Sequence, residues 1–299
     1  MKKDITKKKE CVLCGSKKLK KVLDFKKTPL ANPYIKFTKK RERHYPLVCV
    51  LCIDCKHLQL QHLVNPKILF EDYMYVSGTS PVLVKHFENY FYKIKKSLKL
   101  NKKKDKILDI ACNDGTFLNF FKKDKFKNVI GIEPAKNLRI LNKAKKIDIN
   151  TAFFNLKNSF HYKKKYKEFK VITANNVFAH VPDLKDFALG VKNILSQDGL
   201  FIFEVSYLKD VLKKLTFDTI YHEHMSYHSL KPLLNFFKSI ELEVVDFDLV
   251  EAQGGSIRVY VGHKNSKINI SKINKQIRIE KNSGLFSIKK YLDYFKKIK

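Results

Sequence analysis

From Lys106 onward, short apolar runs rich in β-branched residues alternate with stretches of helical spacing, and this alternation constrains the fold more than any other feature of the sequence. The runs are KILDI, NVIGI, VITAN, GLFIFEV, EVVDFDLV and SIRVYV. Apolar strands separated by helices are typical of a parallel sheet that is covered on both faces. We therefore predict a doubly wound α/β domain over residues 106–265, with an antiparallel addition at its end.

Length and charge narrow the class of protein. The 299 residues, 44% of them hydrophobic, suffice for one such domain and a smaller module. Neither a run of eighteen apolar residues nor an apolar segment in the N-terminal MKKDITKKKECVLC is present, so we expect a cytoplasmic protein without a membrane span. The net charge of +32 comes mostly from lysines spread over every segment. Proteins that bind the grooves of nucleic acids more often have arginines and a localised basic face, so nucleic acid is not the partner we expect.

Five of the six cysteines fall within the first 55 residues. Structural disulfides are not expected in a cytoplasmic chain, so the paired CxxC knuckles CVLCG and CIDC indicate a metal. Four thiolates suit a tetrahedral Zn²⁺ with no open position, which makes the site structural, and Gly15 eases the first turn. Cys49 leaves a second pairing open, but YPLVCV reads as a strand that leads into the knuckle. The preferred ligands are Cys11, Cys14, Cys52 and Cys55.

These features divide the chain into four parts. Residues 1–65 form a zinc-binding module, which at this size needs a metal for stability. Residues 66–105 form a connecting segment and a helix with Ser80 as N-cap and Pro81 in the first turn. The α/β domain at 106–265 follows, and residues 266–299 form a basic C-terminal helix. Its predicted packed face consists of Leu285, Ile288, Leu292 and Phe295.

The first strand of the α/β domain runs into DIACNDGTFLNFF, which places Asp109 before a loop of small residues and a helix that begins near Thr116. Ligands of open α/β sheets bind beyond the carboxyl ends of the strands. Glu133 ends the second strand, where a carboxylate can accept hydrogen bonds from both ribose hydroxyls. The loop lacks the GxGxxG that pyrophosphate needs, and its acidity suits a cationic sulfonium, so S-adenosylmethionine fits better than NAD. The alternative is that both carboxylates merely cap loops.

Several motifs occur in a fixed order between Cys11 and about Val261. They are CxxCG, YPLVCVLCIDCKHLQL, DIACNDGTFL, GIEPA, ANNVFAHVPD, EVSYL, DTIYHEHMSYHSL and GGSIRVYV. This series resembles the S-adenosylmethionine-dependent sugar C-methyltransferases that act on nucleotide-linked 4-keto hexoses, the tetronitrose C-3'-methyltransferases in particular. The resemblance implies a class I methyltransferase (Rossmann-like) sheet behind the zinc-binding module, with S-adenosylmethionine and structural Zn²⁺ as cofactors and a nucleotide-linked keto-sugar as substrate.

The resemblance also assigns roles to individual residues. It supports the same four cysteines as zinc ligands. The implied cofactor-binding residues are Asp109, Ala111, Asn113, Gly115, Glu133 and Asn175. The implied substrate-binding residues are Tyr75, Asn176 and His180. The implied catalytic residues are Tyr221, Glu223 and His224.

Two departures from the family pattern qualify this assignment. Ala111 stands where a glycine is usual, and we expect the loop to tolerate one added methyl group. Relatives continue with a further domain after GGSLRVYV, so we expect a chain that is truncated relative to the family, and a separate protein with that domain is a candidate partner. The alternatives are a non-catalytic or split relative that binds nucleotide sugar, and an RNA methyltransferase with a zinc ribbon.

The segment YHEHMSYHSL, residues 221–230, concentrates three histidines near this pocket. A metalloprotease-like site needs HExxH, but no glutamate lies between His224 and His228. The histidines could also be ordinary surface or core residues. Carbon methylation beside a ketone requires a base near neutral pH, and free imidazole has a pKa of about 6.5. We therefore predict that His224 is the base, that Glu223 orients a partner or the sugar, and that Tyr221 hydrogen-bonds the enolate.

Overall fold

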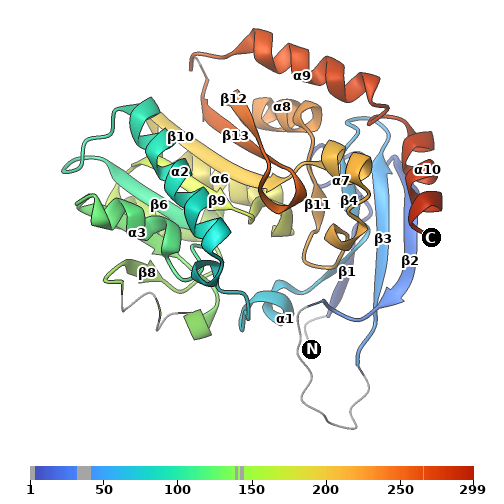
Figure 1. Ribbon diagram of the computed structural model, residues 1–299, viewed down its shortest axis with the longest axis horizontal. Coiled ribbons are helices and arrows are strands. Elements are labelled where there is room, and N and C mark those ends of the chain that lie inside the picture. Colours follow the sequence, from blue (N-terminus) through green and yellow to red (C-terminus); the bar gives the residue numbers. More distant parts are fainter. Residues whose placement is uncertain (1–3, 32–41, 139–140, 142–144, 265) are drawn as a thin grey trace.

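A seven-stranded sheet forms the centre of the computed structural model, which describes residues 4–31, 42–138, 141, 145–264 and 266–299 (Figure 1). Its strands, in spatial order, are β12 (Leu242–Val250), β13 (Ser256–His263), β10 (Leu195–Ser206), β9 (Phe169–Asn175), β6 (Lys106–Ile110), β7 (Asn128–Ile132) and β8 (Asp148–Asn150). The strands from β10 to β8 are parallel, whereas β13 runs antiparallel to both β10 and β12. The predicted doubly wound sheet and its antiparallel addition are confirmed.

Helices cover both faces of this sheet. One face packs against α2 (Pro81–Leu98) and α3 (Thr116–Lys123), and the other against α5 (Leu156–Tyr166), α6 (Leu184–Ile194) and α8 (Leu230–Ser239). Alternation along the strands explains the division, because successive residues point to opposite faces. The predicted start of α2 is confirmed, since the backbone N–H of Leu83 donates to Ser80 Oγ at 3.3 Å and Pro81 is the first helical residue.

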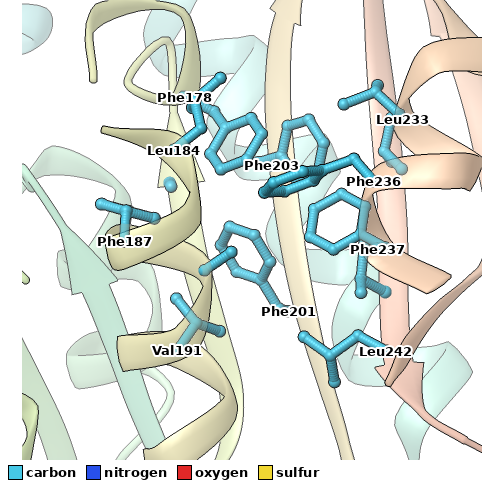
Figure 2. Close-up of a cluster of buried hydrophobic side chains, with 14 of the residues drawn as sticks. Phe178, Leu184, Phe187, Val191, Phe201, Phe203, Leu233, Phe236, Phe237 and Leu242 are labelled. Atoms are coloured by element: carbon cyan, nitrogen blue, oxygen red, sulfur yellow. The ribbon is translucent and has the colours of Figure 1, made fainter. Parts of the chain in front are cut away.

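A cluster of aromatic rings fills the space between α6, β10 and α8 (Figure 2). Phe201 and Phe203 of β10 lie between Phe187 of α6 and Phe237 of α8. The ring of Phe178 packs against that of Phe203 with centroids 4.5 Å apart. Phe178 belongs to the short helix η3 (Phe178–His180), so this packing also fixes the position of His180.

The N-terminal module contains a four-stranded antiparallel sheet in the order β11–β4–β3–β2. Its strands are β2 (Leu19–Thr28), β3 (Tyr45–Cys52), β4 (Leu58–Leu60) and β11 (Ser226–Tyr227). Beside it, β1 (Ile5–Lys7) pairs with β5 (His62–Val64). Because β11 comes from the segment 221–230 and pairs with β4, the module holds that segment against the α/β sheet.

Short helices lie in the segments between the strands and longer helices. They are α1 (Pro66–Phe70), η1 (Ser77–Thr79), η2 (Lys136–Leu138), α7 (Leu208–Lys214), η4 (Phe217–Thr219) and η5 (Ala252–Gly254). Within the described residues, no helix combines the length and apolar character needed to cross a membrane.

The C-terminal segment folds as two helices, α9 (Ile270–Asn282) and α10 (Ile288–Ile298), where we predicted one. The chain turns between them at Gly284, whose φ of +76° lies in the left-handed region. The predicted packed face is confirmed for Leu285, which is buried, and for Ile288 and Phe295, which pack against the hydrophobic cluster of the module. Leu292 was wrongly included, because it is 44% exposed, and Tyr291 and Tyr294 are the buried residues of α10. Phe295 contacts Phe25 of β2, with ring centroids 5.2 Å apart, so α10 lies against the N-terminal module (Figure 1).

Candidate active site

A cavity of about 760 Å³ lies at the carboxyl ends of β6, β7, β9 and β10, between these strand ends and the segment that leads into β11. It brings together most of the residues that we singled out. Those lining it are Tyr75, Asp109, Ala111, Asn113, Glu133, Asn175, Asn176, His180, Tyr221 and His224. Gly115 and Glu223 lie outside the lining: Gly115 precedes α3 with φ +71°, and Glu223 is buried behind the wall.

Two buried carboxyl groups define the strand-end side of the cavity. Glu133 accepts hydrogen bonds from the backbone N–H groups of Asn113 at 2.7 Å and Ala135 at 2.8 Å. Asp109 accepts from Thr173 Oγ1 at 2.7 Å and, more weakly, from Asn175 Nδ2 at 3.4 Å. Burial raises the pKa of each carboxyl group to about 7. A cationic ligand would restore both groups to their ionised form.

The loop between β6 and α3 adopts a left-handed backbone. Ala111 has φ +54° and Asn113 has φ +53°. We expected an alanine in place of the usual glycine to matter through the volume of one methyl group. The structure corrects this reason: the cost of Ala111 is conformational, about 1–2 kcal/mol for a residue with a Cβ in this region.

His224 is held by two hydrogen bonds. Its Nδ1 lies 2.6 Å from the carbonyl oxygen of Thr219, and its Nε2 lies 3.2 Å from Tyr221 Oη. A carbonyl oxygen can only accept, so Nδ1 carries the proton and Nε2 of the neutral ring keeps its lone pair. Burial lowers the pKa of His224 to about 4, below the value of free imidazole on which we based the prediction of a base. The ring is therefore uncharged at neutral pH.

Glu223 receives a hydrogen bond from a tyrosine that we did not predict. Tyr73 Oη donates to Glu223 Oε2 at 3.3 Å, and the Tyr73 side chain lines the cavity. Burial, and then the charge of Glu223, raise the pKa of Tyr73 and Tyr221 above their ordinary value, so both remain protonated donors. Tyr75, the tyrosine that we named in this stretch, lines the cavity as well but is 44% exposed.

His180 lies next to His224 in the cavity lining. Its ring stacks on Phe70 with centroids 5.5 Å apart and lies 5.0 Å from the ring of His224. Its buried Nε2 has no hydrogen-bond partner within the described part of the chain. Burial lowers the pKa of His180 well below its ordinary value, so this ring is also neutral. The cavity thus offers an unpartnered polar atom to a ligand.

The three histidines of residues 221–230 do not converge. His222 Nε2 lies 3.1 Å from the carbonyl oxygen of Tyr45, and His228 Nε2 lies 3.4 Å from that of Phe178. Of the three, His224 alone belongs to the cavity lining. The segment therefore does not form a metal site, and its histidines have separate environments.

The four cysteines that we preferred do converge. Their sulfur atoms all lie within 4.8 Å of one another, with 3.5 Å between Cys11 and Cys55 and 3.6 Å between Cys14 and Cys52. Tetrahedral Zn²⁺ with Zn–S bonds near 2.3 Å separates its sulfurs by about 3.8 Å, so the donor set fits this ion. Cys49 is fully buried in the hydrophobic cluster of the module and is not a member. Gly15 adopts φ +73°, as expected for the first knuckle.

Comparison with known proteins identifies the family. A family model described as "Methyltransferase domain" matches residues 85–246, more than half of the chain, and one described as "Putative zinc binding domain" matches residues 11–70. The chain belongs to the methyltransferase domain family. This methyltransferase is 32% identical to C-methyltransferase NovU of Streptomyces niveus over 253 residues, which are 84% of this chain and 60% of NovU.

Solved structures give weaker likenesses. The methyltransferase shares 15% identity and a TM-score of 0.49 with the PH0226 protein of Pyrococcus horikoshii OT3, over 64% of this chain and 95% of that one. With an S-adenosylmethionine-dependent methyltransferase of Clostridium acetobutylicum ATCC 824 it shares 16% identity and a TM-score of 0.48, over 61% of this chain and 92% of that one.

The cofactors of this methyltransferase are S-adenosylmethionine and zinc, and the cavity fits the former. The acidic strand ends suit its sulfonium and ammonium charges, and the volume falls in the usual range for small-molecule sites. The side-chain oxygen of Asn175 is buried at this edge without a partner among the described residues, which leaves an acceptor for a ligand. The zinc site consists of the four converging cysteines.

Sequence reasoning missed part of the cavity wall. The missed residues include Tyr73, Ser206, Asp218, Thr219 and Gln253. Thr219 contributes its backbone carbonyl, which contacts His224, and a backbone contact cannot be predicted from the type of side chain. Gln253 lies in η5, directly before GGSIRVYV, and has φ +51°. The two glycines that follow it indicate a turn, but not that Gln253 itself adopts a left-handed conformation.

Proposed function

We propose that this methyltransferase transfers a methyl group to the carbon next to the keto group of a nucleotide-linked deoxysugar. The observation that carries the proposal is the arrangement of His224, which lines the cavity with its Nε2 3.2 Å from the hydroxyl group of Tyr221, another lining residue. The similarity to C-methyltransferase NovU supports carbon as the acceptor atom. The sugar-nucleotide class rests on the order of the motifs, which resembles that of the sugar C-methyltransferases.

In this proposal the chain prepares the sugar for attack on the methyl group. His224 Nε2 removes the proton from the carbon beside the ketone. Tyr221 Oη, a protonated donor, leaves Nε2 and donates to the keto oxygen as negative charge develops there. Glu223 is buried close to both tyrosines, and its negative charge offsets the positive charge that forms on the His224 ring. His180 and Asn176, which also line the cavity, contact the sugar.

S-adenosylmethionine, when bound, supplies an electrophilic methyl group on its sulfonium. In the proposed assignment Glu133 accepts hydrogen bonds from the ribose, while Asp109 and Asn175 lie toward the charged end of the cofactor. Ala111 and Asn113 bring the backbone close, and Gly115 allows the turn into α3. The chain contributes proximity and alignment rather than further chemistry at this step.

Cofactor binding is expected to weaken as the pH is lowered. Asp109 and Glu133 titrate near pH 7 in the free protein, and the positive charges of S-adenosylmethionine favour their ionised forms. Affinity should therefore be about tenfold lower at pH 6 than at pH 8 for each proton that binding displaces.

The stability of the free protein should change with pH in the opposite direction. A carboxyl group whose pKa is raised on folding binds more protons when folded, so the free protein gains stability as the pH falls from about 7 toward 4. Calorimetry at pH 6, 7 and 8 checks both, and equal affinity at pH 6 and 8 would contradict the assignment.

The proposed function is tested with purified protein, S-adenosylmethionine and a nucleotide-linked 4-keto-6-deoxyhexose. We expect a product that is heavier by one methyl group and carries it on carbon. In deuterium oxide, without cofactor, the carbon next to the ketone should exchange its proton. Methylation of oxygen, or cofactor binding without exchange or turnover on any keto-sugar nucleotide, would reject the proposal.

A further inference from the structure

The connecting segment contains a strap, defined here as residues 71–77, that lies between α1 and η1 along the cavity. Asparagine side chains from two strand ends bind its backbone. Asn113, beyond β6, accepts from the N–H of Ser77 at 2.8 Å and donates to the carbonyl of Tyr75 at 2.9 Å. Asn137, beyond β7, accepts from the N–H of Tyr73 at 3.1 Å and donates to the carbonyl of the same residue at 2.8 Å.

The two asparagines therefore connect the strap to the cofactor side of the cavity. The backbone N–H of Asn113 also donates to Glu133, the carboxylate between the two loops. At the other side, Tyr73 Oη reaches Glu223. The strap is thus held at two points, by Asn113 next to Glu133 and by Asn137 at Tyr73, whose hydroxyl group reaches the residue beside His224.

We propose that Asn137 is a positioning residue, which holds the backbone of Tyr73 so that its hydroxyl group meets Glu223. This inference rests on the proposed function, because it gives Glu223 a part in the reaction. Asn137 lies outside the cavity lining and does not touch a ligand there. Its two hydrogen bonds to one residue's N–H and C=O fix both the position and the orientation of that peptide, which a single bond would not do.

The position of Asn137 makes the inference testable without loss of the fold. Asn137 is exposed and belongs to the short helix η2, so its amide is not part of a hydrophobic core. Asn128 offers a matched control at the opposite end of the same strand β7. Its Nδ2 also binds a backbone carbonyl, that of Lys103, at 3.0 Å, but Asn128 lies on the amino edge of the sheet and has no hydrogen bond to the strap among the described residues.

The kinetic experiment compares Asn137→Ala with Asn128→Ala. Loss of two ordinary hydrogen bonds predicts a decrease of about tenfold in kcat/KM for the keto-sugar in Asn137→Ala, with S-adenosylmethionine affinity within about twofold of the parent. Asn128→Ala should retain the parent values. In a Tyr73→Phe background the same Asn137→Ala change should have almost no further effect, because Asn137 acts through the Tyr73 hydroxyl. Equal kcat/KM in the two single variants, or a full additional loss in the Tyr73→Phe background, would overturn the inference.

Hydrogen exchange supplies a readout that does not depend on turnover. With S-adenosylhomocysteine bound, the Tyr73 amide should exchange at least about tenfold faster in Asn137→Ala than in the parent, while the Ser77 amide, held by Asn113, should be unchanged. Unchanged exchange at Tyr73 would overturn the positioning role. If the parent protein does not methylate keto-sugars but the exchange result holds, the proposed function fails while the hold of Asn137 on the strap stands.

Discussion

His224→Gln is expected to lower kcat for methyl transfer by about 10²–10⁴-fold, the range for loss of a positioned general base. Glutamine can still donate from its amide to the carbonyl of Thr219, but it cannot accept a proton from carbon. Turnover is measured with saturating S-adenosylmethionine and keto-sugar nucleotide. The affinity for S-adenosylmethionine should change little, because the residues proposed to bind the cofactor lie on the strand-end side of the cavity.

A second measurement isolates the proton-transfer step. In deuterium oxide the parent protein should exchange the proton next to the ketone, and His224→Gln should not. His222→Gln is the matched control, since His222 is an imidazole two residues away that contacts the carbonyl of Tyr45 and lies outside the cavity. Retained exchange in His224→Gln, at the rate of His222→Gln, would show that another group is the base.

The low pKa of His224 adds a condition to this expectation. Burial keeps the ring neutral at pH 7 but also makes it a weaker base than free imidazole. A base of this strength removes a proton from carbon only if the imidazolium and the enolate are stabilised where they form. Glu223 and the Tyr221 hydroxyl are placed for these two tasks, which explains why a cluster is needed where a lone histidine would not suffice.

Local patterns allowed much of the fold to be predicted. β-branched runs marked the strands of the central sheet because buried parallel strands are apolar along their whole length. Ser80 and Pro81 marked the start of α2 because cap chemistry is encoded within a few residues. The cysteine spacing identified the metal ligands for the same reason, and YPLVCV placed Cys49 in a strand that points it into the core.

Features that depend on long-range contacts could not be read in this way. Tyr73 and Tyr75 lie two residues apart in the same stretch, and the difference between them comes from Asn137 and Glu223, which lie far away in the sequence. The pairing of β11 with β4 joins residues more than 160 positions apart through two short strands. On α10, Leu292 was predicted to pack but is exposed, because the buried positions of the helix include Tyr291 and Tyr294, which pack against the N-terminal module.

Because β11 pairs with β4 of the zinc-binding module, loss of zinc should also disturb the cavity. Replacement of one zinc ligand tests this. Cys52→Ser is expected to lose the zinc ion and to unfold the N-terminal module, since binding of structural zinc contributes about 10–16 kcal/mol in small domains. Cys52 ends β3, which pairs with β4, and β4 in turn holds β11 three residues beyond Glu223. Methyl transfer should therefore be lost together with the metal, although no cysteine of the site lines the cavity.

Cys49→Ala separates this effect from the loss of a buried thiol. Cys49 lies in the same strand three residues earlier and is fully buried, but its sulfur is not among the four that converge. This variant should keep one zinc per chain and lose only the packing of one sulfur atom, at most about 1–2 kcal/mol. Mass spectrometry measures the zinc content of Cys52→Ser and Cys49→Ala, and thermal unfolding measures their stability. Zinc lost in Cys49→Ala would mean that the second knuckle uses Cys49 and Cys52. Zinc retained in Cys52→Ser would contradict both pairings, and would mean that the module positions residues 221–230 without the ligand set assigned to it.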